Sequence, residues 1–134
     1  MSNRVDDMPD FHDGLLTGVL VFNKGAMIHV TTVDGAPWTI RLKGVLILRI
    51  VDMCEGNIIL DSEVMETSDG LDAVLEELVR GYQRDTDLKR WKEAIDSGSH
   101  KLLLITPSYG ATALALAESI ETIPGHFLAE ESSL

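Results

Sequence analysis

The stretch with the clearest chemical potential is Asp10-Phe11-His12-Asp13, which places one histidine and two carboxylates within four residues. These groups could ligate a divalent cation, or His12 and Asp13 could act as an acid–base pair. A metal site of this kind needs further ligands, and the sequence contains no HxxxH motif and no second His-Asp pair. The alternative is a turn, in which Asp13 and Gly14 supply local hydrogen bonds and positive φ angles before a strand. The turn is favoured, and His12 and Asp13 are retained as candidate binding residues.

Tyr109 is a third candidate binding residue, because tyrosine would bring apolar area with a polar tip to a turn. The alternative is that its ring lies over a sheet edge. Cys54 would need a nearby base to act as a nucleophile, so we interpret it as structural. Nucleophile-elbow, phosphate-loop, dinucleotide-binding and metalloprotease motifs do not occur, so we predict no catalytic residues, no metal and no cofactor. The other histidines are interpreted as outward-facing or element-boundary residues: His29, His100 and His126.

Composition indicates a globular protein and bears on the kind of partner it can attract. The length of 134 residues suits one domain, 1–134, and the single cysteine excludes an internal disulfide. The amino terminus is polar and acidic, so we expect no secretory signal and a cytoplasmic location. The formal net charge is −11, with no cluster of Lys and Arg, which disfavours nucleic acid and anionic membranes as partners. Such a field would attract a basic protein, although acidity also simply keeps many proteins dispersed.

The elements that must position the candidate residues begin with a β block over residues 10–65. Apolar, β-branched runs alternate there with turn signals, of which Asp34-Gly35 is the strongest hairpin candidate. The pattern predicts an antiparallel meander of five short strands: 15–22, 27–33, 38–43, 45–51 and 58–65.

A helical insertion is predicted over residues 67–98. Apolar residues from Leu71 to Tyr82 recur at the spacing of one face of an amphipathic helix. A second, shorter stripe that ends at Ile95 predicts another helix, which stops at the following Ser-Gly pair. We expect both helices to cover an apolar sheet face formed by Trp38, Ile40 and Leu42.

The second β block, residues 100–128, contains the one ambiguous element. Residues 101–106 are apolar and predict a buried strand, and residues 107–110 predict a turn. Residues 111–123 fit a helical and a two-residue period at once, and their alanine content taken alone favours a helix.

Three short stretches resemble a loose group of small bacterial β-rich proteins, some of which are regarded as immunity proteins of toxin systems. They are Phe11-His12-Asp13-Gly14, Glu55-Gly56-Asn57-Ile58-Ile59 and Ser108-Tyr109-Gly110-Ala111. With flanking strand residues they cover about a third of the chain, and the helical insertion lies outside them. The resemblance implies a β-sandwich or open barrel in which the Ser-Tyr-Gly-Ala turn joins two paired strands. On that ground we expect residues 111–123 to form a strand. The resemblance implies no catalytic residues.

Together the patterns predict an α+β fold, an antiparallel β-sandwich or open barrel of about seven strands with a two-helix insertion covering one face. Three functions stay open. The preferred one is a non-enzymatic protein-interaction module, of which an immunity-type neutraliser of a basic toxin is the specific form. The second is a small metal-dependent or small-molecule enzyme centred on His12 and Asp13, whose side chains should share one pocket with Tyr109. The third is a self-associating structural unit, which would form a homo-oligomer through an exposed strand edge.

Overall fold

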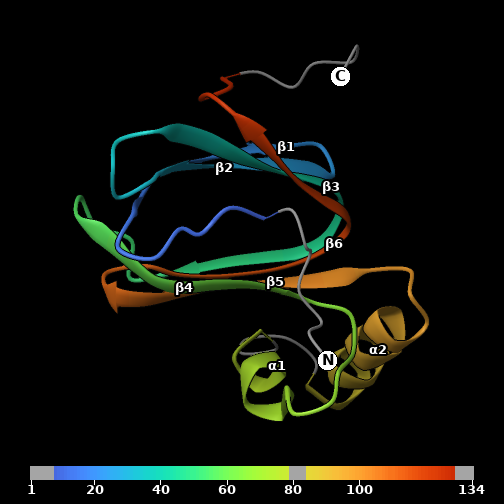
Figure 1. The fold of residues 1–134 in the computed structure, drawn as a ribbon. Coiled ribbons are helices and arrows are strands. Elements are labelled where there is room, and N and C mark those ends of the chain that lie inside the picture. The colour runs from blue at the N-terminus through green and yellow to red at the C-terminus, as the bar shows by residue number, and fades with distance from the viewer. Residues whose placement is uncertain (1–7, 79–83, 129–134) are drawn as a thin grey trace.

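The computed structural model describes residues 8–78 and 84–128. Most of the described chain is antiparallel β-structure, and two helices lie between the fourth and fifth strands (Figure 1). The order of strands, two helices and further strands is as predicted, although Tyr82 of the predicted first helix lies outside the described residues. The elements are β1 (Leu15–Phe22), β2 (Gly25–Thr31), β3 (Pro37–Val51), β4 (Asn57–Met65), α1 (Asp72–Leu78), α2 (Arg84–Asp96), β5 (Lys101–Tyr109) and β6 (Thr112–Pro124).

The strands form a closed barrel in the order β1-β2-β3-β6-β5-β4, and all neighbouring pairs are antiparallel. The prediction of an antiparallel, β-rich α+β fold is confirmed in this coarse form. The finer prediction, a sandwich or open barrel of about seven strands, is wrong. In the part of the chain that the structure describes, the sheet closes on itself with six strands.

Gly44 explains why β3 is one strand where two were predicted. Residues 38–43 and 45–51 run as one strand through Gly44, whose φ of 63° glycine adopts without strain. The ladder to β6 shifts its register between Val45 and Ile47, so the strand bends at this point instead of ending. In Figure 1, β3 and β6 both curve from one layer of the barrel to the other. The expected break between residues 38–43 and 45–51 is therefore a corner of the barrel.

The ambiguous segment 111–123 is a strand, β6, as the resemblance implied. Its alanines, Ala113, Ala115 and Ala117, are buried in the barrel interior. The intervening Leu114 and Leu116 are buried on the outer face against the helices. Burial on both faces explains the continuous apolar run and outweighs the helical preference of alanine, which is worth less than about 1 kcal/mol per residue.

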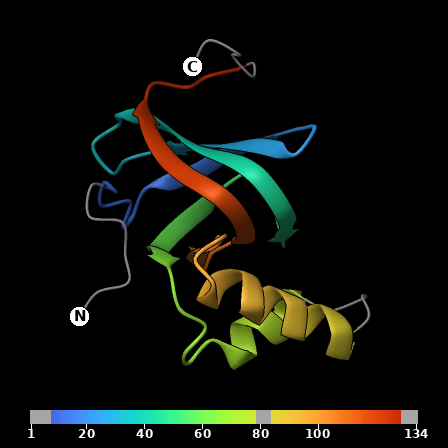
Figure 2. The ribbon, with the colours of Figure 1, turned by 90° about the vertical axis from the view of Figure 1, so that its right-hand side faces the viewer.

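Two apolar clusters hold the molecule together. The first fills the barrel and includes Ile28, Ile40 and Leu103. The second lies between the helices and the outer face of the sheet, and Leu75 and Trp91 are its buried helical members. Figure 2 shows both helices below the barrel.

The predicted contact between the helices and Trp38, Ile40 and Leu42 is wrong. Ile40 and Leu42 face the barrel interior, and Trp38 packs against that same interior cluster. The helices instead cover outward side chains of β3, β5 and β6, which include Ile47, Leu102, Leu114 and Leu116. Within the described residues, no helix is both long enough and apolar enough to span a membrane.

Candidate functional site

His12 and Asp13 lie in a tight turn that leads into β1. Phe11 is fully buried, and its ring packs edge-on against Trp38 with the ring centroids 6.5 Å apart, so it anchors the turn. The Gly14 amide donates to the Phe11 carbonyl at 2.8 Å, and Asp13 has a φ of 63°. The turn that the sequence favoured is confirmed.

The same turn is paired with β4. The Asp13 amide donates to the Ile59 carbonyl at 2.8 Å, and the Ile59 amide donates to the Gly14 carbonyl at 2.9 Å. A Cβ atom at position 14 would lie 2.5 Å from the Thr31 carbonyl oxygen, so this position accepts only glycine. The turn therefore helps to close the barrel between β1 and β4.

The His12 ring is held against the backbone of β4. Its Nδ1 lies 2.7 Å from the Leu60 carbonyl oxygen, so Nδ1 carries a proton and donates. Its Nε2 lies 3.5 Å from a carboxylate oxygen of Asp13. The hydrogen bond to Leu60 raises the pKa of His12 most, and the charges of Asp13, Asp10 and Asp61 raise it further, against a small opposing effect of desolvation.

Tyr109 lies on the other flank of β4. Leu15 of β1 and Tyr109 of β5 both pair with Ile58, one from each side. Residues directly opposite each other on neighbouring strands share a face, so the three side chains form a row across three strands. Ile59 is 1% exposed and faces the interior, whereas the next residue, Leu60, is 46% exposed at a point where the ladder between β4 and β5 shifts its register. We call this set the apolar row: Leu15, Ile58, Leu60 and Tyr109.

The apolar row is a surface and not a pocket. Leu15, Leu60 and Tyr109 are 41%, 46% and 63% exposed, and the His12 side chain is 54% exposed. His12 and Tyr109 therefore lie beside the same strand, β4: His12 contacts the Leu60 carbonyl and Tyr109 pairs with Ile58. Asp10, Asp13 and Asp61 lie near enough to His12 to act on its charge, and we call these three carboxylates the acidic border.

The outer faces of β4 and β5 are covered at one end and bare at the other. Met65 and Leu102 pair across the two strands beneath the helices and are 8% and 0% exposed. The opposite end of the same strands, which carries Leu60 and Tyr109, extends past the helices (Figure 1). Sequence reasoning missed Leu15 and Leu60 as surface residues, because an apolar residue in a strand pattern is ordinarily assigned to the core.

Asn57 joins the other two stretches that carry the resemblance. Its Oδ1 accepts hydrogen bonds from the amides of Cys54 (2.9 Å) and Ala111 (3.0 Å), and its Nδ2 donates to the Leu16 carbonyl (3.1 Å). The Cys54 thiol also donates to Oδ1 at 3.2 Å, in agreement with a structural cysteine. Gly110 has a φ of 90°, and a Cβ there would lie 2.5 Å from Oδ1 of Asn57. These stretches therefore have a structural role where β1, β4 and the β5–β6 turn meet.

The remaining histidines include a stacked pair. The His29 ring lies 4.8 Å from the His126 ring, at an interplanar angle of 19°. His29 Nε2 hydrogen-bonds to the Phe127 carbonyl oxygen, and His126 Nε2 to the Val30 carbonyl oxygen at 3.1 Å. His29 was expected to be an outward side chain, but it is only 8% exposed because the segment after β6 covers it. His100 is a half-buried boundary residue whose Nδ1 contacts the Ser99 hydroxyl at 2.8 Å.

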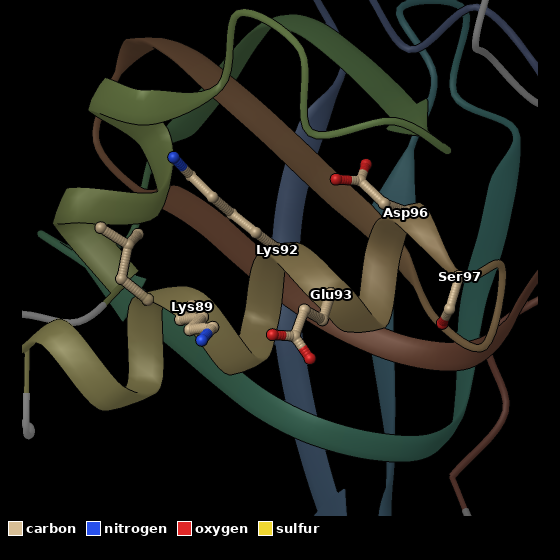
Figure 3. Close-up of a pocket in the computed structure, with 6 residues that line it drawn as sticks. Lys89, Lys92, Glu93, Asp96 and Ser97 are labelled. Carbon is tan, nitrogen blue, oxygen red and sulfur yellow. The ribbon is translucent and has the colours of Figure 1, made fainter.

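A hollow of about 690 Å³ lies along α2 (Figure 3). Two of its charged side chains, Lys92 and Asp96, contact residues that lie outside the hollow. Lys92 Nζ lies 2.8 Å from Asp72 of α1, which raises the pKa of Lys92, and Asp96 accepts from Ser68. Its lining comes from one helix: Leu88, Lys89, Lys92, Glu93, Asp96 and Ser97.

Across residues 8–78 and 84–128, no group of three or more His, Cys, Asp or Glu side chains is arranged to hold a metal ion. Comparison of the chain with protein-family models, with curated proteins and with solved structures finds no match. The charge of the molecule and the surfaces described above are the features that bear on its function.

Proposed function

We propose that this chain is a non-enzymatic protein-interaction module that binds a basic protein. The observation that carries the proposal is the imbalance of charge, 22 acidic against 11 basic side chains. A surface with this excess attracts a positively charged partner over a Debye length of about 8–10 Å and raises the rate of encounter. The proposal requires that the partner be basic and that the association respond to salt.

The specific form of the proposal is an immunity-type neutraliser of a basic toxin. The resemblance of three stretches to a group that includes immunity proteins supports it. The described residues give those stretches a structural role, in the turn before β1 and around Asn57, so they support a likeness of fold and not of binding residues. Exposed side chains within these stretches, which include Asp13 and Tyr109, are still available to a partner.

The enzyme alternative has less support from the geometry. His12 and Asp13 lie on an exposed turn, and Nδ1 of His12 is engaged by the Leu60 carbonyl. The third alternative, self-association, would bring two copies of a molecule of charge −11 together, which electrostatic repulsion opposes.

The proposal is tested by screening the proteins encoded beside the gene of this chain for a basic toxin. The two proteins are co-expressed and purified, and their association rate is measured by stopped flow at about 50 and about 500 mM NaCl. We expect a complex whose association rate falls by about tenfold or more at the higher salt, while the dissociation rate changes much less. No complex at micromolar concentration, or an association rate that does not respond to salt, would contradict the proposal.

A further inference from the structure

The apolar row is unusual because its members are adjacent. Single exposed apolar side chains are ordinary on protein surfaces, whereas contiguous ones mark interaction sites. Leu15, Ile58 and Tyr109 are neighbours on three strands, and Leu60 continues the row along β4. At the other end of β4 and β5, the helices bury the outward apolar residues of these strands. The outward apolar residues at this end are exposed instead.

Tyr109 has the properties of an anchor residue. Tyrosine is enriched among residues that dominate binding energy, because it brings a large rigid area with few rotatable bonds. Its backbone is fixed by the ladder to Ile58 and by the turn at Gly110, which packs against Asn57. Little conformational freedom would be lost on binding, which favours affinity.

The acidic border decides which partner fits. Asp10 accepts from the His12 amide at 3.0 Å, Asp13 lies 3.5 Å from His12 Nε2, and Asp61 directly follows Leu60 on β4. A partner that sets an apolar side chain on the row would place its own flanking residues near these carboxylates, and Lys or Arg suits that position. A second copy of this chain paired about a two-fold axis would bring an identical acidic border to the same interface, which is unfavourable.

We infer that the apolar row and the acidic border together form the docking surface for a basic protein, which seats an apolar side chain on Leu60 and Tyr109 and sets basic side chains against the carboxylates. This inference rests on the proposed function and adds to it the residues that make the contact.

Photo-crosslinking in cells of the native host tests the position of the surface. Benzoylphenylalanine is placed at position 109 and, as a matched control, at position 21, because Val21 is 71% exposed near the other end of β1. We expect the probe at 109 to crosslink to a basic protein and the probe at 21 to give no crosslink to it. The captured protein is then purified for binding measurements.

Affinity measurements on that protein test the individual residues. Tyr109→Ala and Leu60→Ser should each weaken binding by about tenfold or more, and Val21→Ala by less than about twofold. Asp13→Asn with Asp61→Asn should slow association at low salt and change dissociation little. Asparagine tolerates the positive φ at position 13, and urea unfolding of each variant verifies that it remains folded.

The outcomes separate the inference from the proposed function. A basic protein crosslinked from position 21 and not from 109, or full affinity in Tyr109→Ala, overturns the docking surface and leaves the proposed function intact. A crosslink from 109 to a second copy of this chain overturns the assignment of a basic partner. If neither probe captures a basic protein, both the docking surface and the proposed function are overturned.

Discussion

At the scale of single residues, Asn57 shows how one buried polar side chain can organise a junction. It is 2% exposed, and its amide group bonds to backbone groups of β1, of the loop before β4 and of the β5–β6 turn. Replacing such a group leaves several buried donors and acceptors without partners, at about 1–3 kcal/mol each. Gly110 also lies against this amide, so a larger side chain at position 110 would not fit beside Asn57.

Gly110→Ala is the sharpest test of this packing. The new Cβ would lie 2.5 Å from Asn57 Oδ1 and 2.9 Å from Cys54 Sγ, at a φ of 90° that alanine disfavours. We expect the free energy of unfolding in urea to fall by about 2–4 kcal/mol. The control is Gly56→Ala, which has no atom within 4 Å of its added Cβ and should change stability by less than about 1 kcal/mol in either direction. Equal effects of the two substitutions would contradict the packing described for Asn57.

The pH dependence of His12 provides a second test at this scale. Its folded pKa is raised above the ordinary value of 6.5, mainly by the bond to the Leu60 carbonyl and then by Asp13. The stabilisation from protonated His12 is therefore fully present below pH 6.5 and is lost as the pH rises through the folded pKa. NMR titration of the ring should give a value above 6.5, and Asp13→Asn should lower it. A native value at or below 6.5 would show that the ring is not held as described.

At the scale of elements, the helical insertion is fastened to the rest of the chain by polar contacts around an apolar centre. Trp91 and Leu75 are buried between the helices and the sheet. Lys92 of α2 reaches Asp72 of α1, and Asp96 at the end of α2 accepts from the amide and the hydroxyl of Ser68, at 2.8 and 2.7 Å. The last contact closes the insertion, because Ser68 lies before α1.

Asp96→Asn tests this closing contact. The hydrogen bonds from Ser68 hold the pKa of Asp96 below its ordinary value of 3.8. The stabilisation is therefore present above pH 3.8 and is lost as the pH falls through the folded pKa. We expect Asp96→Asn to lower the urea midpoint at pH 7 and to reduce the loss of stability on acidification. Glu93→Gln, on the exposed side of the same helix, is the control; an equal effect there would mean that net charge and not the Ser68 contact is responsible.

At the scale of the whole molecule, the charge of −11 acts on the folded state as well as on partners. Self-repulsion of excess charge destabilises a compact chain, and salt screens it. We expect the urea midpoint at pH 7 to rise as NaCl increases from about 10 to about 300 mM. Near the sequence pI of about 4.6 the same increase should have little effect, because the net charge is then close to zero. A midpoint that is independent of salt at pH 7 would show that the acidic groups are too dispersed to repel each other.

Local chemistry in the sequence determined much of the fold and part of the site. The turn at Asp13 and Gly14, the two-residue period of the strands and the helical stripe ending near Ile95 each depend on residues a few positions apart. Such features can be inferred without knowledge of the rest of the chain. The candidate residues His12 and Tyr109 were also identified from their types and their neighbours.

Only the tertiary structure decided what depends on distant contacts. Gly44 could be a turn or a corner, and the continuation of β3 along β6 made it a corner. The alanine-rich strand β6 exists because both of its faces are buried. Leu60 is exposed, whereas Met65 of the same strand is buried beneath helices that come from a later part of the chain. Contacts of this kind join residues far apart in sequence, so no short window of sequence contains them.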